Sequence, residues 1–221
     1  MDNQRQPNLN VLAMEKRLLE EQLMTSLSVV GVSGNIARPS RTAALVSAIV
    51  AQIAAFAGGN SRLIELVDVG PQLFPSFSAG GLKSFARENL PHVGRSAIEA
   101  IEAADALVVG SPVYKGSYSG AFKHLFDLVR PNALIGKPVL LSATGGTPLH
   151  GLVMEHQLRP LFGFFNALTL PTTIFALEDD FQDYQVGKTE LAVRIKRAAA
   201  EFAELLETKS SRRREPALAL A

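Results

Sequence analysis

The sequence alternates short apolar, β-branched runs with longer segments of helical periodicity, and this alternation constrains the fold more than any other feature. Strands are expected at 27–32, 62–69, 106–109, 138–143 and 172–176. Helices are expected over 42–56, 96–104, 120–129, from the TGGT motif to about 167, and over 189–206. Strands that alternate with helices form a parallel sheet covered on both faces. We therefore expect an α/β fold.

Five expected strands in one unit fit a flavodoxin-like, doubly wound five-stranded parallel sheet with helices on both faces. The expected domain spans 27–208. Residues 1–26 form an N-terminal extension, which is either a frayed leader (with Met24 as an alternative start) or a short helix that docks onto a partner subunit. Residues 209–221 are basic and contain proline, so we expect a disordered tail.

Composition excludes several classes of function. The formal net charge of +1 over 221 residues argues against a nucleic-acid-binding surface. The absence of cysteine excludes disulfides, thiolate catalysis and cysteine-bound metal centres. The sequence lacks both an apolar run long enough for a membrane helix and a signal peptide, so a cytoplasmic protein is expected. The four histidines form no H-E-x-x-H pair, and no metal site is expected.

The loop after the first expected strand combines hydroxyl groups and arginines with the start of a helix. Its hydroxyls belong to Ser33, Ser40 and Thr42, and its cations are Arg38 and Arg41. Together with the helix dipole, these groups suit a phosphate monoester. The alternative is an ordinary serine N-cap beside two solvated arginines. The loop matches neither a P-loop nor a G-x-G-x-x-G dinucleotide fingerprint.

Two further loops follow the third and fourth expected strands. In residues 111–120, Pro112 fixes one backbone angle and Tyr114 offers a flat apolar surface beside Lys115, which suits a planar aromatic ligand. The alternative is a tight turn whose tyrosines pack on their neighbours. In residues 144–147 (TGGT), paired glycines allow a close backbone approach to a ligand, although many strand-to-helix turns look the same.

The segments SGNIARPSRT (33–42), SPVYKGSYSGAFKHLFDL (111–128) and ATGGTPLHGLVMEHQLRPLF (143–162) resemble the NAD(P)H-dependent FMN reductases. The resemblance covers about 26–206 and extends to the branch that serves alkanesulfonate and methanesulfonate monooxygenases. It implies that FMN binds at the sheet edge and that its phosphate contacts Ser33, Arg38, Ser40, Arg41 and Thr42. The other cofactor-binding residues that it implies are Pro112, Val113, Tyr114, Lys115, Ser119, Thr144, Gly145, Gly146 and Thr147.

The resemblance also implies the reaction. Hydride passes directly from NADH or NADPH to the flavin, so no side chain is expected to act as an acid, base or nucleophile. Reduced FMN then leaves for an FMNH2-dependent monooxygenase of sulfonate metabolism. One alternative is a reductase that retains FMN and reduces quinones, azo dyes or metal ions. Another is an electron carrier, against which the pI near 8.0 argues.

His156 is the least ordinary residue of the last long helical stretch. Pro160, four residues later, cannot donate a hydrogen bond to the carbonyl of His156, so we expect a kink or a single π-turn there. His156 is then either a satisfied core histidine or, as the resemblance implies, an interface residue beside the flavin of a homodimer or homotetramer. In the second case it assists flavin exchange without transferring a proton.

Overall fold

The computed structural model describes residues 27–73 and 90–218, with side chains described as far as Lys209. A parallel sheet in the order β2-β1-β3-β4-β5 lies at the centre, and β6 also pairs with β4. Its strands are β1 (Ser28–Ser33), β2 (Asn60–Glu65), β3 (Ala106–Pro112), β4 (Pro138–Gly145), β5 (Leu168–Thr169) and β6 (Ile174–Leu177). This order confirms the doubly wound, flavodoxin-like sheet. A separate antiparallel hairpin joins β7 (Phe181–Gln182) to β8 (Gln185–Val186).

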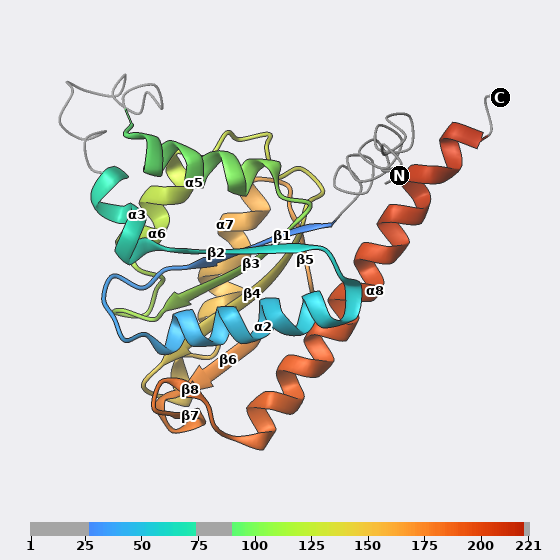
Figure 1. Ribbon diagram of the computed structural model, residues 1–221. Coiled ribbons are helices and arrows are strands. Elements are labelled where there is room, and N and C mark those ends of the chain that lie inside the picture. Colours follow the sequence, from blue (N-terminus) through green and yellow to red (C-terminus); the bar gives the residue numbers. More distant parts are fainter. Residues whose placement is uncertain (1–26, 74–89, 219–221) are drawn as a thin grey trace, which may run out of the picture.

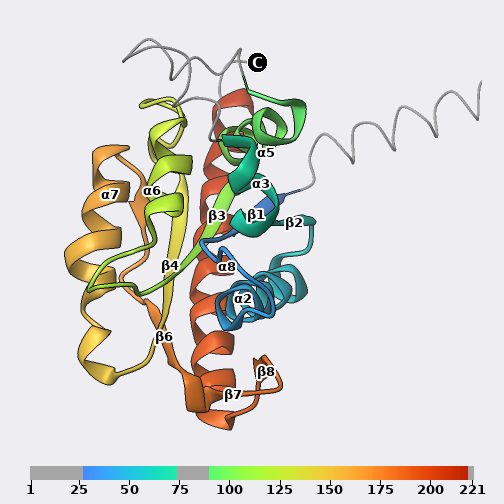
Figure 2. The same ribbon diagram turned by 90° about the vertical axis from the view of Figure 1, so that its left-hand side faces the viewer.

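Helices cover both faces of the sheet, as Figures 1 and 2 show. The helices are α2 (Arg41–Ala57), α3 (Leu66–Leu73), α5 (His92–Ala103), α6 (Gly120–Asp127), α7 (Arg159–Phe164) and α8 (Thr189–Leu218). α2 and α8 pack against one another on one face, and the remaining helices lie on the other. Each face therefore has its own apolar core, in which the buried strands contact the helices above or below them.

The central strands are buried on both faces, which explains their continuous apolar runs. Every residue of β3 is buried. α2 lies close to this part of the sheet because two strand positions are glycine. A Cβ atom at Gly110 would lie 2.4 Å from the Val46 side chain, and one at Gly31 would lie 2.9 Å from it. The start of α2 is thereby held beside the ends of β1 and β3.

The second strand is shorter than predicted. The expected strand at 62–69 ends at Glu65, and the chain continues directly as α3. β2 stops there because its partner β1 ends at Ser33, which is in register with Glu65. Leu66, Val69 and Leu73 are buried at helical spacing in α3.

The stretch after TGGT is an interrupted helix, and the predicted π-turn is confirmed. It begins with the 3-10 turn Pro148–His150, continues as the π-helix Met154–Leu158 and ends as α7. Arg159 N–H donates to the carbonyl of Met154, a five-residue spacing. The Arg159 guanidinium also donates to the Leu170 carbonyl at 2.8 Å, which ties this helix to the last sheet strands.

The expected strand at 172–176 corresponds to β6, and the short strand β5, which was not predicted, precedes it on the same edge of β4. β5 pairs with the beginning of β4 and β6 with its end. Pro171 lies between them and has no N–H to donate, so the ladder is interrupted there.

The structure describes most of the C-terminal segment but not the N-terminal one. α8 continues to Leu218, so the backbone is helical over most of the 209–221 segment for which disorder was predicted. Lysine, arginine and glutamate in that segment are good helix formers and extend α8. The predictions for residues 1–26 lie outside the described residues.

Candidate functional site

The carboxyl ends of β1, β3 and β4 meet at one edge of the sheet, at the left of Figure 1. The chain leaves β1 and β3 toward opposite sides, and ligands bind at such switch points. A cavity of about 270 Å³ lies here. The predicted cofactor-binding residues that line it are Ser40, Arg41, Thr42, Pro112, Val113, Tyr114, Thr144, Gly145 and Gly146. The structure thus brings all three predicted loops to one cavity.

The first turn of α2 forms one wall of this cavity. Ser40 is the N-cap residue, and its Oγ accepts a hydrogen bond from Ala43 N–H at 3.2 Å. No acidic side chain lies in the first turn of α2, so none of its own residues neutralises the positive end of the helix dipole. Arg41 adds a full positive charge at the same place. This wall is suited to bind a phosphate or another anion.

A hydrogen bond joins the first loop to the third. The hydroxyl groups of Thr42 and Thr144 lie 2.6 Å apart, and both residues are buried. The bond fixes the start of α2 relative to the end of β4, so the two walls of the cavity are held at a constant separation.

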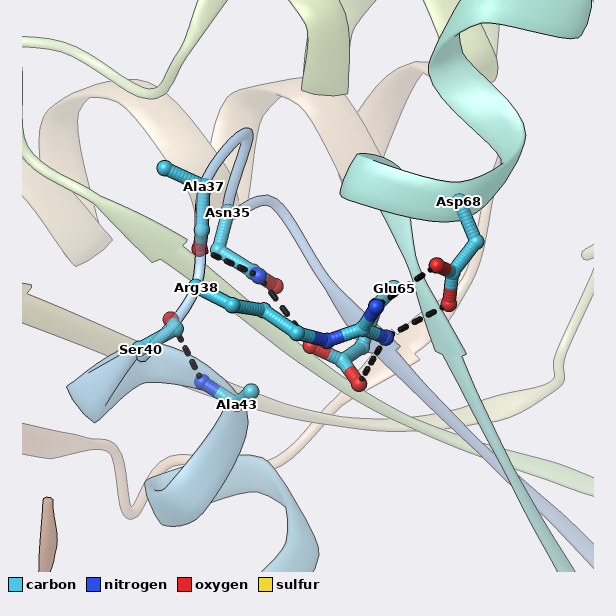
Figure 3. Close-up of polar contacts among 7 residues, drawn as sticks. All are labelled: Asn35, Ala37, Arg38, Ser40, Ala43, Glu65 and Asp68. Carbon is cyan, nitrogen blue, oxygen red and sulfur yellow. Dashed lines mark hydrogen bonds and ion pairs between the residues drawn. The ribbon is translucent and has the colours of Figure 1, made fainter.

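Arg38 lies in the first loop but its guanidinium is held by carboxylates, as Figure 3 shows. It donates to both Asp68 oxygens, at 2.7 and 2.6 Å, and to Glu65 at 2.7 Å. Asp68, and after it Glu65, raises the pKa of Arg38, and Arg38 lowers the pKa of Asp68. Asn35 donates a further hydrogen bond to Glu65 at 3.1 Å. Arg38 therefore ties the first loop to the junction of β2 and α3 and does not line the cavity.

The two predicted serines outside the cavity are buried beneath it. Ser119 donates to the Gly34 carbonyl at 2.9 Å and caps α6 by accepting from Phe122 N–H at 3.3 Å. Ser33 is fully buried, and its Oγ has no hydrogen-bond partner among the described residues. Ser119 therefore supports the first loop from below.

The second loop contains a two-residue turn. Tyr114 and Ser117 exchange backbone hydrogen bonds of 2.9 and 3.2 Å across Lys115 and Gly116, which have φ angles of 53° and 79°. Tyr114 is half exposed and lines the cavity, whereas Lys115 lies at the exposed tip. The Tyr114 side chain therefore lies at the cavity and is not packed in the core.

The third loop, residues 144–147, exposes backbone to the cavity. A Cβ atom at Gly146 would meet no atom within 4 Å, so this backbone is open to a ligand. Thr147 points elsewhere, since its hydroxyl accepts a hydrogen bond from Leu149 N–H at 3.4 Å and caps the 3-10 turn.

Sequence reasoning missed six residues that line the cavity: Asn35, Ile36, Ala37, Pro39, Glu178 and Tyr184. The first four belong to the predicted first loop and lack a charge or hydroxyl that would single them out. Glu178 precedes the hairpin of β7 and β8, and Tyr184 lies in its turn. No local pattern connects either residue to a loop more than a hundred residues earlier. Glu178 forms an ion pair with Arg41, and the Arg41 guanidinium lies 5.1 Å from the centre of the Tyr184 ring.

His156 lies in the π-helix and is exposed, so it is not a core histidine. The face around it is also apolar and exposed, since Leu149, Leu152 and Phe164 are 88%, 63% and 69% exposed. Ser117 of the second loop donates to Gln157 at 3.2 Å, which connects the π-helix to the cavity wall.

The described residues contain no cluster of three His, Asp or Glu side chains that would hold a metal ion. In the same part of the chain, no helix combines the length and hydropathy needed to span a bilayer.

The chain matches known proteins over most of its length. The family model for NADPH-dependent FMN reductases matches residues 27–182. "NADH-dependent FMN reductase SfnF" of Pseudomonas fluorescens is 48% identical over 182 residues, which are 82% of this chain and 93% of that protein. "FMN reductase (NADPH)" of Pseudomonas aeruginosa is 47% identical over 188 residues, 85% of this chain and 97% of that protein. An oxidoreductase structure from Corynebacterium diphtheriae has a TM-score of 0.69 and 31% identity, covering 83% of this chain and 98% of that one.

Proposed function

The chain belongs to the NADPH-dependent FMN reductase family. From this membership we propose that it binds FMN in the cavity at the sheet edge and releases reduced FMN as a product. It is an NAD(P)H-dependent FMN reductase. The observation that carries the proposed site is the convergence of three loops on one cavity that opens beside the N-terminus of α2.

The residues of the cavity fit FMN at its phosphate end. The dipole of α2, the hydroxyl of Ser40 and the charge of Arg41 favour a phosphate dianion. The Oδ1 atom of Asn35 is buried at the cavity wall without a hydrogen-bond partner among the described residues. A ribityl hydroxyl would satisfy this acceptor.

The opposite side of the cavity fits the isoalloxazine ring. Pro112, Val113 and Tyr114 give an apolar surface, and the backbone at Gly146 is open. When bound, FMN accepts a hydride from NADH or NADPH at its isoalloxazine ring. The side chains of this cavity bind and orient the two ligands, and none has to donate or remove a proton.

The cavity volume is close to that of small-molecule sites. At about 270 Å³ it lies just below the range of ~300–1,000 Å³ that is typical of small-molecule sites. We propose that the acceptor of reduced FMN is a partner monooxygenase, of the kind that acts on sulfonates.

The exposed apolar face around the π-helix is proposed to contact a second copy of this chain. Leu149, Leu152 and Phe164 would be buried there together with His156, which is exposed in the single chain. Large apolar side chains that are exposed together often mark a site of protein–protein interaction. Because the Ser117–Gln157 hydrogen bond joins this face to the second loop, oligomerisation would stabilise the wall that holds the isoalloxazine ring.

Steady-state oxidation of NADH and NADPH with increasing free FMN tests this function. If FMN is a substrate, the rate rises with FMN concentration to a plateau and many equivalents of FMN are reduced per protein. A rate that is independent of added FMN once one equivalent is bound, and that rises instead with a quinone or an azo dye, would indicate a reductase that retains its flavin. The same assay gives the preference between NADH and NADPH.

A further inference from the structure

The segment after β6 contacts Arg41, the residue proposed above to bind the FMN phosphate. Glu178, which begins the 3-10 turn Glu178–Asp180, forms an ion pair with Arg41. Tyr184, in the turn between β7 and β8, places its ring under the same guanidinium. Both residues line the cavity together with the first loop. Arg41 is thus contacted from a segment that is remote in sequence.

The backbone that carries Tyr184 is strained. Asp183 and Tyr184 form the two-residue turn of the hairpin, with φ angles of 47° and 59°. Such turns usually contain asparagine and glycine, because residues with bulky side chains are unfavourable in this left-handed region. A tyrosine at this position is strained, and such strained residues cluster at functional sites. Here the strained turn brings the tyrosine ring beneath Arg41.

The contact between Glu178 and Arg41 is partly exposed to solvent. The Glu178 side chain is 66% exposed and that of Arg41 is 35% exposed. An exposed pair of this kind contributes little to fold stability. A carboxylate and a phosphate would, however, compete for the same guanidinium, because both are acceptors of its paired N–H groups.

We propose that Glu178 is a built-in competitor of the flavin phosphate for Arg41, and that Tyr184 is a positioning residue that keeps the guanidinium between the two. This inference rests on the proposed function, in which Arg41 binds the FMN phosphate. When the phosphate leaves, Glu178 replaces it as the partner of Arg41, so the protein loses less interaction energy on release. The pair thereby shortens the residence time of FMN, as an enzyme that exchanges its flavin requires.

Glu178→Gln tests the competition, because it removes the charge and keeps the size of the side chain. FMN and riboflavin affinities are measured by quenching of flavin fluorescence, and FMN dissociation by stopped flow. Relative to the wild type, Glu178→Gln should bind FMN about two- to fivefold more tightly and release it correspondingly more slowly, the factor expected for an exposed ion pair. Its affinity for riboflavin, which lacks the phosphate, should be unchanged.

Asp179→Asn is the matched control. Asp179 is the next residue, is exposed, and forms no ion pair with a described side chain. The substitution therefore removes the same charge from the same turn and should change neither affinity. An equal tightening in both variants would show a general charge effect and would overturn the proposed competition.

Two substitutions of Tyr184 test its positioning role. Tyr184→Phe keeps the ring and should bind FMN as the wild type does. Tyr184→Leu removes the aromatic ring beneath Arg41. The ratio of the FMN affinity to the riboflavin affinity should therefore be smaller than in the wild type. If the wild type prefers FMN but Glu178→Gln binds it equally or more weakly, only the present inference is overturned. If the wild type binds FMN and riboflavin equally, the phosphate site of the proposed function is wrong as well.

Discussion

Lys137 is a buried cation at the end of the sheet opposite the cavity. Its Nζ donates hydrogen bonds to the carbonyls of Ile101 and Glu102, at 3.0 and 2.7 Å, at the C-terminus of α5. Burial lowers its pKa to about 8 from the usual 10.5, although the carboxylates of Asp105 and Glu102 act in the opposite direction. The charged form of this lysine is therefore less favourable in the folded protein than in the unfolded chain.

This shift predicts a pH-dependent stability with a defined sign. Between about pH 8 and pH 10.5 the unfolded chain binds more protons at Lys137 than the folded chain does, so stability rises with pH across this range. The free energy of unfolding of the wild type, relative to that of Lys137→Met, should increase between pH 8 and pH 10. Urea denaturation of both proteins at the two pH values measures it. A difference that stays constant or decreases would show that Lys137 is charged in the folded protein.

Arg38 and Arg41 show how far the sequence determines the site at the scale of single residues. Both belong to the predicted phosphate loop, and the local sequence does not indicate which of the two lies at the cavity. The structure separates them through distant partners, since Arg38 is held by Asp68 and Glu65, whereas Arg41 lies at the cavity. Local patterns predict which loops form the site, but the direction of a long side chain depends on charges that tertiary structure brings close.

At the scale of elements, the irregular helix after TGGT was predictable because Pro160 removes a defined hydrogen bond. The shortening of β2 and the additional short strand β5 were not predictable in this way. They depend on where β1 ends and on how β5 and β6 pair with β4. The hairpin that carries Tyr184 was missed because β7 and β8 are only two residues long.

His156→Ala tests the proposed role of the π-helix. His156 is exposed among large apolar side chains, so its removal should weaken contact with a second copy. We expect the dissociation constant of the oligomer to rise about fivefold or more, as for loss of an interface contact worth about 1 kcal/mol, or FMN release to slow. Hydride transfer to FMN that is already bound should persist. Analytical ultracentrifugation and single-turnover reduction measure these effects.

His92→Ala serves as the control for this variant, because His92 is an exposed histidine at the start of α5, outside the π-helix. An oligomeric state and a turnover with free FMN that match the wild type in both variants would contradict the interface role of His156.

At the scale of the whole molecule, periodicity predicted the fold correctly because buried parallel strands and amphipathic helices leave different patterns. Because the predicted domain contains both the sheet and the cavity, we expect residues 24–208 to suffice for folding and activity. The buried side chains of α8 end at Leu206, and the Lys209 contact with the Gly136 carbonyl is peripheral. A chain of this length should unfold within a few degrees of the full protein and keep its FMN reductase rate. Thermal unfolding and NAD(P)H oxidation check this, and a folded but inactive product would show that a terminal segment contributes to the site.

The binding of FMN and riboflavin to the wild type, Arg41→Ala and Arg38→Ala, measured by isothermal titration calorimetry, tests the account most directly. Arg41→Ala should lose about 1.5–3 kcal/mol of FMN binding, roughly 10- to 150-fold in affinity, because a charge-assisted hydrogen bond to the phosphate is removed. Its riboflavin affinity should not change. Arg38→Ala should weaken both flavins by similar factors, because Arg38 orders the loop and does not line the cavity. Equal affinities of the wild type for FMN and riboflavin, or an unchanged FMN affinity in Arg41→Ala, would contradict the account.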